Sequence, residues 1–191
     1  TGIINKFMPK WEYGTNLKIF YYGKTYKHNG IGIKENREIG VEIIGDKNQN
    51  IDLSTLNTAN KIISRYSDDY LIEIGNSKVL KGIIQACQFS KYDSDRILDL
   101  LYSKNKQELS EYLSKLTYRE PMSTLLNLLD LEGTYEEVTS QIKGLYLNDM
   151  IKAGLQELKK VDDYMKSITN NIIYDLSMVS ELSYYDGIKI G

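Results

Sequence analysis

Apolar and polar positions alternate with period two in the first third of the chain, which is typical of β-strands. The spacing predicts strands over residues 17–23, 39–45 and 70–75, each of which ends at a glycine. Residues 24–37 lie between the first two strands and contain two glycines, so we expect a flexible hairpin loop there. Over residues 52–65 the apolar spacing changes to i, i+3 and i+7, which predicts a helix.

The middle of the chain, from about residue 78 to 158, has the apolar spacing of amphipathic helices almost throughout. The clearest stripe lies over residues 109–116, where Leu, Tyr, Leu and Leu stand at i, i+3, i+4 and i+7. Pro121 suits the start of a further helix, since proline is favoured at the first helical position. We interpret these stripes as a packed helical core and not as a cofactor site.

Strand character returns near the end of the chain, over residues 172–176, and residues 182–190 are predicted to form a further strand or hairpin. The order of strands, helices and strands is typical of the α+β class, with an antiparallel sheet and helices on one side. We therefore expect a single domain over residues 1–191, with sheet parts at about 1–77 and 170–191 and a helical insertion at about 78–169.

Carboxylates stand in apolar surroundings on several of the predicted strands. Because side chains alternate between the two faces of a strand, Glu38, Gly40 and Glu42 share one face of the second strand. Glu73 and Asp175 stand beside apolar residues on two other strands. If helices cover one face of the sheet, these acids would line a cleft on the other face, suited to a ligand with a cationic amine and an aromatic ring. The pattern is also typical of an ordinary solvated sheet face, and strand spacing alone favours that second interpretation.

The composition excludes several classes of binding site. With 24 Lys and Arg against 26 Asp and Glu, the net charge is −2 and the pI about 5.6, so the chain has no broad phosphate-binding character. Cys87 and His28 are the only residues of their types, which excludes an intrachain disulfide and a cysteine-based zinc site. The sequence contains no phosphate-loop, dinucleotide-binding or HExxH motif and no run of 18 apolar residues. We expect a soluble, cytoplasmic domain without a cofactor or metal.

Five segments resemble, in the same order, the motifs of one known family. Residues 39–46 (IGVEIIGD) closely match its Q-x-G-V-E-x-I-G-D signature, and residues 179–187 (VSELSYYDG) resemble its V-R-G-L-D-Y-Y-T-G motif. Three further segments match more weakly. Residues 1–6 are similar to T-G-P-I-A-R, and residues 24–27 are similar to the V-F-R of class II motif 2. Residues 72–76 are similar to a strand that ends in D-x-G-H. The family comprises histidyl-tRNA synthetases and their paralogue, the regulatory subunit of ATP phosphoribosyltransferase.

The resemblance implies a fold and a site. The fold would be α+β, with an antiparallel sheet of the class II aminoacyl-tRNA synthetase type and a helical insertion, and this chain would be a fragment of the full domain. The implied histidine-binding residues are Glu38, Gly40, Glu42, Glu73, Tyr184, Tyr185 and Gly187. The positions that correspond to a vestigial ATP site are Lys27, Asn29 and Ser180.

Departures from the family pattern distinguish the two branches. Ser180 and Glu181 stand where the synthetase motif has arginine and glycine. Lys27 replaces the motif 2 arginine, Asn29 replaces an acid, and Glu38 replaces a glutamine. Adenylate formation places developing charge on a phosphate, which needs fixed cationic donors such as arginine. We therefore expect the pocket to hold histidine without activating it.

The implied function is thus a non-catalytic regulatory subunit of ATP phosphoribosyltransferase, which activates the catalytic subunit and contributes to histidine feedback in the first step of histidine biosynthesis. The implied partners are the catalytic subunit and histidine. The protein would form a homo-oligomer within a hetero-oligomer. Neither tRNA nor a membrane is expected as a partner. One alternative is a histidyl-tRNA synthetase, an ATP-dependent ligase. A third candidate is a stand-alone amino-acid sensor.

Overall fold

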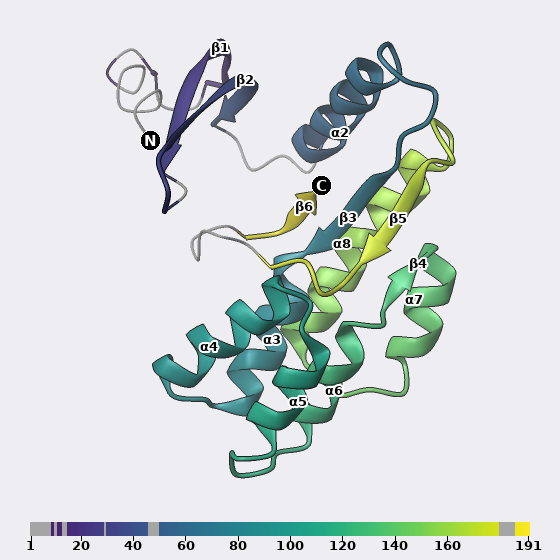
Figure 1. The fold of residues 1–191 in the computed structure, drawn as a ribbon. Coiled ribbons are helices and arrows are strands. Elements are labelled where there is room, and N and C mark those ends of the chain that lie inside the picture. The colour runs from purple at the N-terminus through teal and green to yellow at the C-terminus, as the bar shows by residue number, and fades with distance from the viewer. Residues whose placement is uncertain (1–8, 10, 13–14, 29, 46–49, 180–185) are drawn as a thin grey trace. The chain divides into compact units, whose positions relative to one another are not determined.

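The computed structural model describes residues 9, 11–12, 15–28, 30–45, 50–179 and 186–191 (Figure 1). The chain divides into two compact units, Thr1–Ile51 and Asp52–Gly191, and each is described by itself below. The expected organisation as one domain over residues 1–191 stays a prediction.

The N-terminal unit contains an antiparallel hairpin of two long strands, β1 (Leu17–His28) and β2 (Ile33–Ile44). The pairing runs without interruption from Leu17 opposite Ile44 to His28 opposite Ile33. The predicted loop over residues 24–37 is therefore wrong, since most of it is strand. Its β-favouring residues and cross-strand contacts explain the difference: Glu35 forms an ion pair of 2.9 Å with Lys24 and accepts a hydrogen bond of 3.2 Å from the hydroxyl of Tyr26.

The C-terminal unit is built on a four-stranded sheet with the order β4–β5–β3–β6. Its strands are β3 (Ile72–Asn76), β4 (Glu132–Gly133), β5 (Ile172–Asp175) and β6 (Ile188–Ile190). Two of the pairings are antiparallel, as expected, but β3 and β5 are parallel. Parallel neighbours need a long crossover, and the helical insertion between them is that connection.

The described residues contain seven helices, six of which lie between β3 and β5 in the chain. Their bounds are α2 (Asn50–Ile63), α3 (Ser77–Cys87), α4 (Lys91–Tyr102), α5 (Lys106–Leu113), α6 (Pro121–Leu128), α7 (Tyr135–Ile142) and α8 (Asp149–Met165). Pro121 occupies the first turn of α6, as predicted. The mixed α+β class and the helical insertion are thus confirmed.

The core of the C-terminal unit lies between the sheet and the helices. In Figure 1, α8 runs beside β3 and β5, while α3 to α6 gather beyond one end of the sheet. Ile72 and Ile74 of β3 are fully buried, as are Ile151 and Met165 of α8. The apolar stripes predicted from the sequence therefore form a packed core.

Candidate functional site

Three of the expected site residues lie on one face of the hairpin. In the register of the two strands, Glu38 pairs with Gly23, Gly40 with Tyr21, and Glu42 with Ile19. Glu38 and Glu42 are partly buried on this face, whereas Ile39 and Val41 of the opposite face are exposed. The alternation read from the sequence thus assigns these three residues to the same face.

Gly40 has a neighbour that the sequence analysis did not identify. A Cβ atom added to Gly40 would lie only 2.1 Å from Cζ of Tyr21, so the tyrosine ring packs directly over the glycine backbone. An aromatic ring of this kind across from a strand glycine covers the backbone that lacks a side chain. The ring of Tyr21 thus occupies the space directly beside the Gly40 backbone. Only the strand register, which local spacing does not specify, brings the two residues together.

The expected ATP-site position on the hairpin lies at the far end of β1. Lys27 is exposed and pairs with Lys34, four pairs along the ladder from Glu38, or about 13 Å at the usual rise per strand residue. His28 follows it and accepts a hydrogen bond of 3.1 Å from the backbone N–H of Gly30. This end of the hairpin therefore carries Lys27 well apart from Glu38 and Glu42.

In the C-terminal unit, the two faces of β3 have different neighbours. Ile72 and Ile74 are buried on the helix side, and Glu73 belongs to the opposite face with Asp175 of β5. Glu73 is partly buried, and its backbone N–H and carbonyl pair with Gly191 at 3.1 and 2.9 Å. Glu38 and Glu42 lie in the separate two-stranded sheet, and the expected cleft lined by carboxylates stays a prediction.

Asp175 is a structural carboxylate and has protein partners for both of its oxygens. The residue is only 2% exposed, and Oδ1 accepts hydrogen bonds of 2.7 Å from both the backbone N–H and the hydroxyl of Ser177. Its Oδ2 lies 2.9 Å from Nζ of Lys104, which comes from the connection between α4 and α5. This acid therefore stabilises the turn that leaves β5.

Gly187 lies at the other end of the β3–β6 ladder from Glu73. Its φ of +86° is in the left-handed region that favours glycine, and its carbonyl accepts hydrogen bonds from the backbone N–H and the hydroxyl of Ser77, at 2.9 and 3.2 Å. Ser77 is the first residue of α3. The glycine of the Y-Y-x-G motif is thus held against the junction of β3 and α3.

A buried polar network, missed by the sequence analysis, surrounds this junction. Asn76 is 2% exposed and caps α3, because its Oδ1 accepts a hydrogen bond of 2.9 Å from the backbone N–H of Lys78. Its Nδ2 donates to the carbonyl of Gly154 at 3.2 Å and to Oε2 of Glu157 at 2.8 Å. Glu157 also forms an ion pair with Lys78. An asparagine directly before a helical pattern is a capping signal that could have identified the first of these residues.

Charged side chains near the junction of β3 and α3 shift the pKa values of Lys78 and Asp52. The hydrogen bond to Glu157 raises the pKa of Lys78, and Asp186 and Asp52 act in the same direction. Partial burial raises the pKa of Asp52, and the charge of Glu157 adds to that effect. Glu157 contacts the ammonium group of Lys78, while Asp52 and Asp186 act on it through their charge alone.

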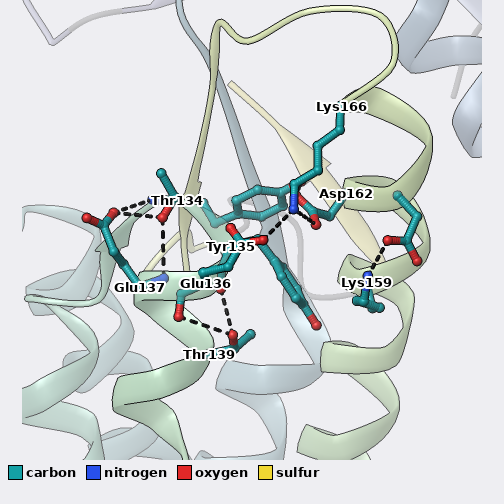
Figure 2. Close-up of polar contacts among 10 residues, drawn as sticks. Thr134, Tyr135, Glu136, Glu137, Thr139, Lys159, Asp162 and Lys166 are labelled. Carbon is teal, nitrogen blue, oxygen red and sulfur yellow. Dashed lines mark hydrogen bonds and ion pairs between the residues drawn. The ribbon is translucent and has the colours of Figure 1, made fainter.

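A separate open cavity of about 240 Å³ lies between α7, α8 and β5. Figure 2 shows Lys166 between the carboxylates of Glu136 and Asp162, and the hydroxyl of Tyr174 donates to Oδ1 of Asp162 at 3.2 Å. These hydrogen bonds raise the pKa of Lys166, while desolvation raises that of Tyr174. None of the expected site residues lines this cavity, and its polar groups connect three elements of the fold.

The remaining expected site residues, Asn29, Ser180, Tyr184 and Tyr185, lie outside the described residues. The structure therefore groups Glu38, Gly40 and Glu42 on the hairpin, and Glu73 and Gly187 in the sheet of the C-terminal unit. Within the described ranges, no helix is long and apolar enough to cross a membrane, and no three His, Cys, Asp or Glu side chains are arranged to hold a metal ion.

Comparisons with known proteins agree with the motif pattern. The sequence profile described as histidyl-tRNA synthetase matches residues 8–190. An ATP phosphoribosyltransferase regulatory subunit from Alkaliphilus metalliredigens is 31% identical over 160 residues, which cover 81% of this chain and 40% of the relative. A histidine–tRNA ligase from Methanococcus aeolicus is 27% identical over 178 residues, which cover 90% of this chain and 42% of the relative. The chain thus spans about two fifths of the length of these curated relatives.

Solved structures share the fold. A crystal structure described as an ATP phosphoribosyltransferase regulatory subunit/histidyl-tRNA synthetase from Bacillus halodurans superposes with a TM-score of 0.83 and 23% identity, over 98% of this chain and 50% of that one. A chain of the ATP phosphoribosyltransferase complex from Thermotoga maritima superposes with a TM-score of 0.76 and 15% identity, over 99% of this chain and 67% of that one. At these identities, the superpositions establish the fold alone.

Proposed function

We propose that this chain, which belongs to the histidyl-tRNA synthetase family, is part of a non-catalytic regulatory subunit of ATP phosphoribosyltransferase. In this role the full-length protein activates the catalytic subunit and contributes to feedback by histidine in the first step of histidine biosynthesis. Its place of action is the cytoplasm. The similarity to a curated regulatory subunit, at 31% identity over most of this chain, supports this branch of the family.

The observation that carries the proposal is the replacement of phosphate-binding residues. Ser180 and Glu181 stand in place of the arginine and glycine of the synthetase motif, and Lys27 stands in place of the motif 2 arginine. Loss of one preorganised donor at a developing oxyanion typically costs about 3–4 kcal/mol of transition-state stabilisation. A lysine also cannot reproduce the bidentate contacts of a guanidinium. The changes therefore disfavour adenylate formation.

Histidine is the ligand that we assign to the pocket, held by Glu38, Gly40, Glu42, Glu73, Tyr184, Tyr185 and Gly187. Glu42 would accept a charge-assisted hydrogen bond from the amine or the imidazole N–H, worth about 1.5–3 kcal/mol. The grouping of Glu38 and Glu42 on one face of the hairpin, beside the ring of Tyr21, supports an acidic and aromatic pocket.

The partner that we assign is the catalytic subunit of ATP phosphoribosyltransferase, within a hetero-oligomer that contains a homo-oligomer of this protein. A solved complex of ATP phosphoribosyltransferase from Thermotoga maritima contains a chain of the same fold, which supports this assembly. The balance of 24 basic against 26 acidic residues gives no support to a tRNA-binding surface.

The proposal is tested by histidine-dependent exchange of pyrophosphate into ATP, measured with the full-length protein. We expect no exchange above background, because the groups that would stabilise the adenylate transition state are replaced. Robust exchange that is abolished by Lys27→Ala would contradict the proposal. A matched control is Lys34→Ala, which changes the cross-strand neighbour of Lys27 on the same hairpin.

A histidyl-tRNA synthetase is the second candidate, because the matching profile carries that description and a curated ligase is 27% identical to this chain. A full-length gene that encodes a motif 3 arginine and an anticodon-binding domain would favour it.

A further inference from the structure

The open cavity between α7, α8 and β5 is large enough for a small molecule. It is lined by residues from the beginning of α7, the end of α8, the connection that follows α8, and β5. Its volume of about 240 Å³ corresponds to about eight water molecules at ~30 Å³ each. This is below the size of a site for a drug-sized ligand, so the cavity suits a molecule of a few heavy atoms.

One carboxylate that lines the cavity is buried in the fold. Asp162 is only 3% exposed, and its Oδ1 accepts a hydrogen bond of 3.2 Å from the hydroxyl of Tyr174. Its Oδ2 is also buried and lies 2.9 Å from Nζ of Lys166. Apart from that ion pair, no group of the described residues donates a hydrogen bond to this oxygen. Because a buried carboxylate is costly without a compensating charge, Asp162 requires a cation at this point of the cavity.

The cation that meets this requirement in the structure is easily displaced. The side chain of Lys166 is half exposed, and its second partner, Glu136, is 67% exposed (Figure 2). Ion pairs between exposed side chains contribute little to stability, because water screens them and long side chains lose conformational freedom. Lys166 can therefore rotate into solvent and leave its place between the two carboxylates to another cation.

Two tyrosine rings make the cavity suitable for an organic cation. The rings of Tyr135 and Tyr174 meet edge to face, with their centroids 5.6 Å apart. The ammonium group of Lys159 already lies 5.7 Å from the centroid of the Tyr135 ring. Aromatic rings attract guanidinium and ammonium groups in this way. A metal ion is a poorer candidate, because the described ranges contain no group of three His, Cys, Asp or Glu side chains that could hold one.

The charges in the cavity disfavour an anion. The carboxylates of Glu136 and Asp162 share the single ammonium group of Lys166, so these three residues together carry one negative charge. A phosphate or carboxylate ligand would find only a lysine that is already paired with two acids. A ligand cation in the place of Lys166 would instead keep the charge of Asp162 compensated, while its apolar part covers the tyrosine rings.

We propose that this cavity binds a small organic cation, a guanidinium or primary ammonium compound, which displaces Lys166 and pairs with Asp162 and Glu136. The site shares no residue with the proposed histidine pocket, so the inference goes beyond the proposed function and does not depend on it. Since the ligand would contact α7, α8 and β5 together, its binding would stabilise the C-terminal unit.

The test uses the full-length protein and methylguanidinium as the probe, with saturation-transfer NMR of the probe and thermal unfolding of the protein as readouts. Methylurea, which has nearly the same shape without the charge, is the control ligand. The variants are Lys166→Ala, Glu136→Gln and Asp162→Asn. The matched control variant is Lys152→Gln, which removes another exposed ion pair of α8, with Asp149.

We expect saturable binding of methylguanidinium to the wild type and no binding of methylurea. Lys166→Ala should bind the probe about fivefold more tightly, because no ammonium group has to be displaced from its exposed ion pairs. Glu136→Gln should bind about threefold more weakly, since it loses an exposed ionic contact. Asp162→Asn should bind at least about tenfold more weakly, since it loses a charge-assisted hydrogen bond. Lys152→Gln should match the wild type.

Thermal unfolding gives an independent readout of the same exchange of cations. Lys166→Ala leaves the buried Asp162 without its counter-charge, so its Tm should lie below that of the wild type. Millimolar methylguanidinium should then raise the Tm of this variant more than that of the wild type, because a ligand stabilises the state that it binds. Methylurea should raise neither.

Several outcomes would overturn the inference. One is the absence of saturable binding to the wild type, and another is equal binding of methylurea. Equal affinity of the wild type and Lys166→Ala would show that the probe does not take the place of Lys166. If Asp162→Asn fails to fold, Glu136→Gln decides, because its side chain is exposed, and unchanged affinity in that variant would overturn the proposal. A failure to bind histidine or to activate the catalytic subunit would contradict the proposed function alone.

Discussion

Gly75 shows how closely the residues around the site are packed. A Cβ atom at this position would lie 2.7 Å from the carbonyl oxygen of Asp175 and 2.9 Å from Sδ of Met178. The turn that leaves β5 therefore crosses directly over the Gly75 backbone, and only glycine leaves room for it. The same turn leads into the segment that carries the Y-Y-x-G motif.

We expect Gly75→Ala to lower the free energy of unfolding by about 1–3 kcal/mol, because a methyl group must displace backbone or a packed side chain. Gly144→Ala is the matched control, since its added Cβ would meet nothing closer than 3.9 Å. That variant should stay within about 0.5 kcal/mol of the wild type. Denaturant unfolding measures both, and equal changes in the two variants would contradict the packing described for Gly75.

Cys87 is buried in the helical core, and desolvation raises the pKa of its thiol to about 11, from an ordinary value of 9.0. The thiolate is the reactive form, so alkylation of Cys87 at pH 8 should be far slower in the native protein than in denaturant. Because the native thiol keeps a proton that the unfolded chain loses, its contribution to stability should fall as the pH rises from 9 towards 11. Mass spectrometry of the Cys87 peptide measures the labelling, and rapid native labelling would contradict this burial.

Glu42 tests the histidine assignment at the level of one side chain. Glu42→Ala should weaken histidine binding by about 10- to 150-fold, which corresponds to the 1.5–3 kcal/mol of a charge-assisted hydrogen bond. Val41→Ala is the control, because Val41 neighbours Glu42 on the exposed opposite face of β2. Calorimetry on the full-length protein measures both. If Glu42→Ala and Tyr185→Ala both bind like the wild type, the ligand lies elsewhere.

At the scale of elements, the helices could be predicted because their signals are local. Apolar stripes indicate α3 to α8, and side-chain caps at Ser90, Asn105, Thr134 and Asn148 mark where four of them begin. The hairpin loop was predicted wrongly because two glycines outweighed the β-favouring residues around them. The parallel pairing of β3 with β5 was not predicted. The spacing of apolar residues within a strand does not indicate which strands become neighbours in the sheet.

The capping box of α7 provides a test of these local signals. Thr134 accepts from the backbone N–H of Glu137, while the Glu137 carboxylate accepts from the backbone N–H of Thr134 at 2.8 Å. Thr134→Ala should therefore lower the free energy of unfolding by about 1 kcal/mol. Ser140→Ala, an exposed change in the last turn of the same helix, should have almost no effect. Thermal unfolding compares the two, and an equal shift in both would refute the role of the cap.

At the scale of the whole molecule, the family could be predicted from motif order, but the contacts of the site could not. Asn76 and Glu157 are 81 positions apart, and Lys104 meets Asp175 from a different element. Such contacts follow from the packing of α3 and α8 against the sheet, which periodicity does not specify. Asp175 illustrates the consequence, since its spacing suggested a ligand cleft while its buried carboxylate is bound by Ser177 and Lys104.

The central claim is that the full-length protein regulates a separate catalytic subunit and does not activate histidine itself. The most direct measurement is ATP phosphoribosyltransferase activity of the purified catalytic subunit, titrated with the full-length protein in the presence and absence of histidine. We predict that activity rises to a plateau at a fixed stoichiometry and that histidine lowers it. Unchanged activity at every ratio, with no association between the two proteins, would contradict the account.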